Sequence, residues 1–202
     1  SFKIGDTRIL TMPKLSTHRL VFSGKPIGLP GLLSFGYDVF RNAGELETHG
    51  HNGYELCYLL SGRVRWRFGS DLQDIAGRDA TVLPPDFIHG GVDGVMHPCK
   101  LFWLILDRSL DGLSLSADEQ ADCRLVWSAP AKTTVSSDDL EWTLIRTRDA
   151  LRRGTDPFLA RSLTRLTLAL FRRTFSDAAR RNDSPPPVVR AVELINRRLF
   201  EK

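Results

Sequence analysis

The spacing of apolar residues changes once along this 202-residue chain, near residue 136, and this change constrains the fold more than any other feature. Before it, short runs of alternating apolar and polar residues are separated by turn residues. After it, apolar residues recur every three or four positions. A period of two is typical of half-buried strands and a period near 3.6 of amphipathic helices. The sequence therefore predicts a β-rich front part followed by a helical part.

Five runs in the front part are predicted to be strands, and RVRWRF (63–68) is the clearest. Its apolar residues share one face and its arginines the other. The remaining runs are LLSFGYDVF (32–40), YELCYLL (54–60), ATVL (80–83) and KLFWLIL (100–106). Ser61-Gly62 is predicted to be a turn between two strands. KLFWLIL is apolar on both faces, which predicts a central position or a covering helix. Several short strands at this spacing indicate an antiparallel barrel or sandwich.

Two helices are predicted next, the first capped by Ser136 and stopped by Gly154, the second beginning at Asp156-Pro157. The second helix carries leucines at spacings of four, three and four, a pattern typical of a helix–helix seam. These leucines are Leu159, Leu163, Leu166 and Leu170. We expect them to form the interface of a homodimer. The alternative is that the seam packs only on the chain's own barrel.

RRNDSPPP (180–187) is predicted to be a stiff linker, because consecutive prolines cannot continue a helix. The segment VVRAVELINRRLFEK (188–202) then has the pattern of a third, amphipathic helix. One amphipathic helix alone has nothing to bury its apolar face against. We therefore interpret this segment as the beginning of a truncated second domain.

Composition narrows the class of protein. No apolar run approaches the roughly 18–20 residues of a membrane span, and the N-terminal segment lacks the layout of a signal peptide. We therefore expect a cytoplasmic protein with no membrane partner, in which Cys57, Cys99 and Cys123 remain reduced. Residues 1–145 carry a net charge of −4 and residues 146–202 one of +8. The basic rear part indicates either proximity to nucleic acid or arginines on outer helix faces.

The stretch HGHNGYEL (49–56) places two histidines and a glutamate where one face of a strand can present them. His89 follows two further predicted strands, and an antiparallel sheet can return it to the same place. Imidazoles and a carboxylate are the ligands of zinc, nickel, iron(II) and manganese. We predict that a divalent transition metal, zinc or nickel, binds to His49, His51, Glu55 and His89. The alternative is a metal-free cluster in which Glu55 accepts hydrogen bonds from the imidazoles.

HGHNGYELCYLLSG (49–62) resembles the first cupin motif, with its HxH, three residues, glutamate, six residues and glycine. GRDATVLPPDFIH (77–89) resembles the second motif, which carries the third histidine. Three turn positions depart from the motifs: Gly44 lies one residue too close to the first histidine, Asp86 replaces a glycine, and Asp93 replaces an asparagine. The resemblance implies a mainly β fold with α, a double-stranded β-helix (jelly-roll) barrel followed by a C-terminal helical hairpin.

The order of the parts resembles the AraC family of bacterial transcription regulators, in which a cupin-like sensing domain precedes a dimerisation hairpin and a DNA-binding domain. The resemblance implies an N-terminal arm (1–19), a barrel (20–107), a connecting segment (108–135), a hairpin (136–179), a linker (180–187) and the first helix of a truncated helix-turn-helix domain (188–202). A small-molecule effector in the barrel would then control the attached domain. The resemblance implies no enzymatic activity, and contact with DNA only through that missing domain.

The barrel interior is expected to provide a largely apolar effector pocket with a few polar groups. We predict that its lining includes Cys57, Val64, Trp66, Phe68 and Trp103. An alternative function is a cupin metalloenzyme, a dioxygenase or isomerase, that uses the His/His/Glu/His site. Metal-dependent turnover by the isolated chain would favour the enzyme. A longer gene with two helix-turn-helix units would favour the regulator.

Overall fold

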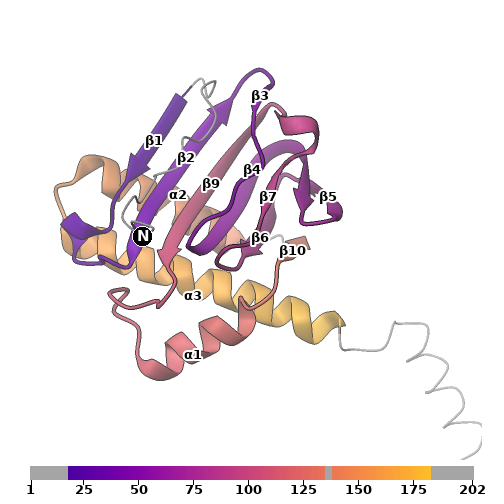
Figure 1. The fold of residues 1–202 in the computed structure, drawn as a ribbon. Coiled ribbons are helices and arrows are strands. Elements are labelled where there is room, and N and C mark those ends of the chain that lie inside the picture. The colour runs from indigo at the N-terminus through magenta and orange to yellow at the C-terminus, as the bar shows by residue number, and fades with distance from the viewer. Residues whose placement is uncertain (1–17, 135–137, 183–202) are drawn as a thin grey trace, which may run out of the picture.

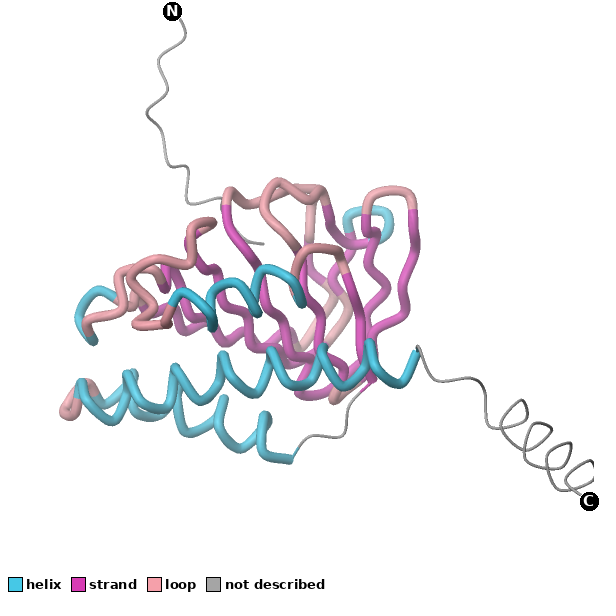
Figure 2. Tube along the Cα trace, turned by 90° about the horizontal axis from the view of Figure 1, so that it is seen from below, coloured by secondary structure: helices cyan, strands magenta, loops and turns pink. Residues whose placement is uncertain are grey.

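The computed structural model describes residues 18–134 and 138–182, and the order of its elements follows the predicted change from strands to helices (Figure 1). The strands are β1 (His18–Phe22), β2 (Leu32–Phe40), β3 (Gly44–Glu45), β4 (Gly53–Phe68), β5 (Asp71–Ala76), β6 (Asp79–Leu83), β7 (His89–Gly91), β8 (Val95–Met96), β9 (Cys99–Asp107) and β10 (Ala131–Thr134). The helices are α1 (Ala117–Val126), α2 (Asp138–Arg153) and α3 (Pro157–Asn182), with short 3-10 turns η1 (Lys25–Ile27) and η2 (Val92–Gly94). In Figure 2, α2 and α3 lie side by side along one face of the strands.

The main sheet has the strand order β1-β2-β9-β4-β6-β10, and every pair in it is antiparallel. Strand β4 also pairs with β5 and β7, so it runs through both sides of the barrel. It changes direction at Ser61-Gly62, where its pairing with β9 is irregular and Gly62 has a φ of 99°. The prediction of a turn here is wrong, because a glycine with positive φ bends one continuous strand.

Alternation along the central strands separates two apolar cores. Phe102 and Leu104 of β9 face a core shared with the helices, while Leu101 and Trp103 face a second core inside the barrel. Strand β9 lies between β2 and β4, which confirms the central position predicted from its two apolar faces. The main sheet is therefore the wall between the barrel interior and the helical layer.

The connecting segment predicted at 108–135 contains two elements that the sequence reading missed. Helix α1 begins with a capping box, in which the Ser116 hydroxyl accepts from the Glu119 N–H and the Glu119 carboxylate accepts from the Ser116 N–H. Strand β10 then pairs with β6 at the end of the main sheet. The barrel sheet therefore extends beyond residue 107, the predicted end of the barrel.

The helix boundaries agree in part with the prediction. Gly154, with a φ of 64°, follows the end of α2, and Asp156 Oδ1 accepts a hydrogen bond from the Leu159 N–H at 2.9 Å at the start of α3. Helix α3 continues to Asn182, so the linker predicted from residue 180 begins inside a helix. The predicted cap Ser136 and the predicted third helix (188–202) lie outside the described residues. Residues 18 and 19, assigned to the arm, belong to β1.

The leucines predicted as one seam on α3 are divided between two environments. Leu170 is only 7% exposed and belongs to the core shared with the barrel, and Leu163 is partly buried against the same core. Leu159 and Leu166 are 41% and 45% exposed. Only part of the stripe is therefore open to a partner. None of the described helices is long and apolar enough to cross a membrane.

Candidate metal centre and ligand pocket

The four predicted ligands converge on the inner side of the barrel. One donor atom from each of His49, His51, Glu55 and His89 lies within 4.8 Å of the other three. His49 and His89 form an antiparallel bridge, in which each backbone N–H donates to the other's carbonyl at 2.8 Å. His51 precedes β4, and Glu55 lies in this strand. Backbone pairing therefore brings together residues forty positions apart in the sequence.

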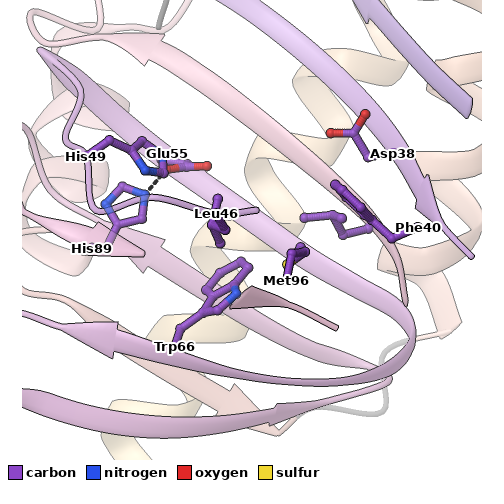
Figure 3. A pocket seen from close by; sticks show the side chains of 9 residues that line it. Asp38, Phe40, Leu46, His49, Glu55, Trp66, His89 and Met96 are labelled. Atoms are coloured by element: carbon purple, nitrogen blue, oxygen red, sulfur yellow. Dashed lines mark ion pairs between the residues drawn. The ribbon is translucent and has the colours of Figure 1, made fainter. Parts of the chain in front are cut away.

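Glu55 is the centre of the cluster. Its Oε2 lies 2.8 Å from His89 Nε2 and 3.2 Å from His51 Nε2. Figure 3 shows Glu55, His49 and His89 gathered at one end of a pocket, with the contact between Glu55 and His89 dashed. The three imidazole rings lie 4.4–5.5 Å apart between centroids. Glu55 and His89 are buried, whereas the His51 side chain is 15% exposed, so solvent reaches one side of the cluster.

Backbone carbonyls orient two of the histidines. The Nδ1 of His49 lies 2.7 Å from the carbonyl oxygen of Glu47, and that of His89 lies 3.0 Å from the carbonyl oxygen of Phe87. Because a carbonyl can only accept, each Nδ1 carries the proton, and each Nε2 of a neutral ring presents a lone pair to the cluster. Metal-binding histidines are held by the same outer hydrogen bond.

Burial and mutual attraction set the ionisation of the cluster. Burial lowers the pKa of His49, and repulsion from His89 lowers it further. Burial also lowers the pKa of His89, but attraction by the Glu55 carboxylate outweighs this effect and the net shift is upward. Burial raises the pKa of Glu55, yet the neighbouring His89 and His51 hold it well below its usual range. Without metal, the Glu55 carboxylate is therefore ionised, and its charge favours the protonated form of His89.

The donors fit a transition-metal ion after a small adjustment. His49 Nε2, His51 Nε2 and Glu55 Oε2 are buried and make no aligned hydrogen bond with the described residues. Three nitrogens and one oxygen suit zinc or nickel. Bonds of about 2.0–2.2 Å place donors about 3.3–3.6 Å apart around a tetrahedral ion and about 4.4 Å apart across an octahedral one, so donors that lie up to 4.8 Å apart must draw closer when the ion binds. The four residues would then hold the ion, which would supply Lewis acidity at this position.

The turn residues that depart from the cupin motifs preserve the required backbone. Asp86 and Asp93 have φ values of 63° and 54°, in the left-handed region that glycine and asparagine favour. Aspartate tolerates this conformation better than most residues. The Asp86 N–H donates to the His51 carbonyl at 2.7 Å, which fixes the start of β4. These two substitutions therefore do not displace the ligands.

Cys57 lies beside the cluster but is not equipped to bind metal as a thiolate. Its Sγ donates to Glu55 Oε1 at 3.3 Å. Burial and repulsion from Glu55 raise the pKa of Cys57 well above its usual range. The thiol therefore stays protonated and orients the second oxygen of Glu55.

The pocket next to the cluster is small. Its lining consists of Asp38, Phe40, Leu46, His49, Glu55, Trp66, His89, Met96 and Leu101. The space open to the centre of a water molecule is about 10 Å³, room for about one water. Of the predicted lining residues, only Trp66 is among these. Cys57, Val64, Phe68 and Trp103 instead belong to the packed core of the barrel.

Asp38 is the polar lining residue that the sequence reading missed. It lies at the far end of the pocket from the histidines (Figure 3) and is 1% exposed. Its Oδ2 accepts from Trp103 Nε1 at 2.9 Å, and Arg19 lies 3.1 Å from Oδ1. Burial raises the pKa of Asp38, and Arg19 and Trp103 only partly offset this effect. The sequence feature that could have identified Asp38 as a lining residue is its acidic side chain within the otherwise largely apolar run LLSFGYDVF.

A barrel of antiparallel strands that gathers three histidines and a glutamate on its inner side, followed by helices, defines the class: the fold is the predicted cupin barrel with C-terminal helices. Residues 43–126 match the family model described as the AraC-like ligand binding domain. The matched region runs from just before β3 to the end of α1, so α2 and α3 lie outside it. No curated protein matches the chain.

Several solved structures resemble the chain. A cupin superfamily protein from Desulfitobacterium hafniense is 16% identical, with a TM-score of 0.34, over 46% of this chain and 80% of that one. A predicted oxalate decarboxylase from Thermotoga maritima is 14% identical, with a TM-score of 0.38, over 46% and 93% of the two chains. Oxalate decarboxylase from Bacillus subtilis, a protein with Mn(II) centres, is 15% identical, with a TM-score of 0.40, over 57% and 31%.

Proposed function

We propose that this chain is the ligand-sensing and dimerisation part of an AraC-type bacterial transcription regulator. The observation that carries the proposal is the match of residues 43–126 to the AraC-like ligand binding domain, followed by the α2–α3 hairpin. A small-molecule effector bound in the barrel biases the position of a DNA-binding domain that follows α3. Such control requires that the effector bind two states with different affinities.

The proposal is tested on the gene and on its full-length product. The reading frame beyond Lys202 should encode two helix-turn-helix units, and the product should bind promoter DNA with sequence specificity. The 202-residue chain is the matched control, because base readout needs a recognition helix seated by its partner helix. It should show only weak, salt-sensitive attraction. A frame that closes after Lys202, or specific binding by the control at high salt, contradicts the proposal.

A cupin metalloenzyme is the second candidate, because the same four side chains suit a metal with open coordination positions. We propose binding rather than turnover, because the family model that matches residues 43–126 is described as a ligand binding domain. Turnover of a small oxygenated substrate by zinc-, iron- or manganese-loaded chain, abolished in Glu55→Gln, would establish the enzyme instead.

We further propose a cytoplasmic location. Cys57, Cys99 and Cys123 are all buried and form no disulfide. Unpaired cysteines are typical of proteins in a reducing compartment. Fractionation of cells that produce the tagged protein tests this location.

A further inference from the structure

Resting on the proposed function, we infer that the effector of this domain is a divalent transition-metal ion bound by His49, His51, Glu55 and His89, and that Tyr58 carries its effect to α2. The barrel would then sense the ion itself, and the ion would not serve as an anchor for an organic ligand. Three observations support this inference: the size of the pocket, the position of the ligands in the chain, and a contact that crosses the main sheet.

The pocket has the size of an ion site. Pockets for organic effectors usually enclose about 300–1,000 Å³. The cavity beside the cluster has a volume of about 10 Å³ and holds about one water molecule. Large side chains fill the rest of the barrel: Trp66 is 4% exposed, Phe40 4% and Met96 2%. An ion and one bound water fit beside Glu55 without displacing this core.

The ligands belong to three segments that an ion would tie together. His49 lies between β3 and β4, Glu55 lies in β4, and His89 begins β7. Without an ion, the contacts of Glu55 with His89 and His51 join these segments, and an ion would replace them with metal–ligand bonds to all four side chains. His51 is partly exposed, so an ion can enter and leave. A change in ion concentration therefore alters how firmly β4 is held.

Strand β4 connects this cluster to the helices. Glu55 faces the ligands, and three residues along the strand Tyr58 faces the opposite side. Tyr58 is fully buried, and its hydroxyl donates to Glu141 Oε2 of α2 at 3.0 Å. Arg78, in the turn before β6, pairs with Asp138 at the first residue of α2. The beginning of α2 is therefore attached to the strand that the ion would hold.

Zinc chloride added to the metal-free 202-residue chain provides the test, with hydrogen–deuterium exchange as the readout. We expect zinc to slow exchange in the first turns of α2 by at least about fivefold, the lower range of allosteric coupling. Glu55→Gln should bind zinc weakly and show no such slowing. His51→Ala, at a partly exposed position, serves if Glu55→Gln does not fold. His97→Ala removes an exposed histidine outside the cluster and should behave like the wild type.

Tyr58→Phe separates binding from transmission. It should bind zinc with wild-type affinity, because the hydroxyl lies on the other side of the sheet, but lose most of the slowing in α2. Tyr37→Phe is the matched control, since Tyr37 lies in the same core and no hydrogen bond of its hydroxyl is found among the described residues. Equal loss of the response in both tyrosine variants would contradict the role of Tyr58.

Two further results would overturn the inference. Zinc that binds and leaves α2 exchange unchanged is a structural ion and not the signal. Absence of binding by zinc, nickel, manganese and iron(II) excludes the ion altogether and leaves the proposed regulator with an organic effector. The open groove lined in part by Tyr37, Cys99 and Lys100, with a space of about 500 Å³, would then be its candidate site. A reading frame that closes after Lys202 contradicts the proposed function whatever zinc does.

Discussion

Two backbone carbonyls decide what the histidines of the cluster can do. The carbonyls of Glu47 and Phe87 accept hydrogen bonds from Nδ1 of His49 and His89, which leaves both Nε2 atoms for the cluster, and that of His89 lies 2.8 Å from Glu55 Oε2. If His89 were neutral, the lone pair on its Nε2 would face the Glu55 carboxylate at 2.8 Å, and the two would repel each other. A positive charge must therefore lie at this point, either as the proton of an imidazolium or as a metal ion.

Elemental analysis distinguishes these two states. In protein purified without a nickel column, we expect about one zinc or nickel ion per chain, as in a site with four protein ligands. His51→Ala should lose most of this metal, because it removes one donor while the other three keep their contacts. His97→Ala is the control and should retain it. Metal content that is unchanged in His51→Ala would place the ion elsewhere.

Asp38→Asn should change how stability depends on pH. Because the pKa of Asp38 is raised above 3.8 in the folded protein, folding favours its protonated form. The wild type therefore gains stability relative to the variant as the pH falls through the raised pKa, and the gain is complete below 3.8. Asparagine keeps an acceptor for the Trp103 indole N–H. Urea unfolding of both proteins from pH 7 downwards measures the difference. A constant difference across this range would contradict the shift.

Among the elements, β4 depends on the glycine at its bend. A Cβ at Gly62 would lie 2.6 Å from the Pro98 carbonyl oxygen, and its φ of 99° is unfavourable for other residues. We expect Gly62→Ala to lower the free energy of unfolding by about 2–4 kcal/mol, from strain plus the clash. Gly94→Ala is the control: its φ is 71°, but nothing lies within 4 Å of the added Cβ. It should cost about 1–2 kcal/mol, measured by urea unfolding. Equal losses in the two variants would mean that a Cβ at Gly62 makes no close contact with the Pro98 carbonyl.

Helix α3 is expected to form a homodimer through the part of its leucine stripe that remains exposed. Leu159 and Leu166 lie about two turns apart on one side of the helix, next to Phe158, which is 73% exposed. Leu159→Arg with Leu166→Arg should therefore halve the mass measured by sedimentation without unfolding the chain. Leu125→Arg on α1, where Leu125 is 77% exposed, is the control. Unchanged mass in the double variant places the interface elsewhere.

The sequence predicted the elements with strong periodicity and missed those whose role depends on partners. Apolar runs located β2 and β9, the period near 3.6 located α2 and α3, and the motif spacing located the four residues of the histidine–glutamate cluster. The leucine stripe was divided because a period of 3.6 shows which residues share a face and not which neighbour covers it. Leu170 meets the barrel, whereas Leu166 does not. Of the residues predicted to line an effector pocket, only Trp66 lines the cavity beside the cluster, whose walls come from β2, β8 and β9 as well as β4, and the register of these strands is set by long-range pairing.

For the whole molecule, the barrel and the hairpin share one apolar core. The core on the helix side of the main sheet takes residues from the strands and from α2 and α3 alike. Its large side chains from the two helices are Leu140, Leu144, Leu168, Leu170, Phe171 and Phe175. At roughly 2 kcal/mol for each buried side chain, they contribute about as much as the 5–15 kcal/mol net stability of a typical domain. We therefore expect the barrel and the hairpin to unfold together, although the apolar spacing changes near residue 136.

Truncation tests this dependence. A chain that ends at residue 134 keeps every described strand and all four ligands but exposes Tyr58, Phe102 and Leu104 on the main sheet. We expect it to be insoluble, or soluble without a cooperative thermal transition, because an uncovered apolar sheet face favours association. A chain that ends at residue 182 keeps both helices and should melt cooperatively. If the shorter chain melts cooperatively and binds zinc as the longer one does, the hairpin is a separate layer. The ion site could then not depend on α2, and the barrel would hold its metal alone.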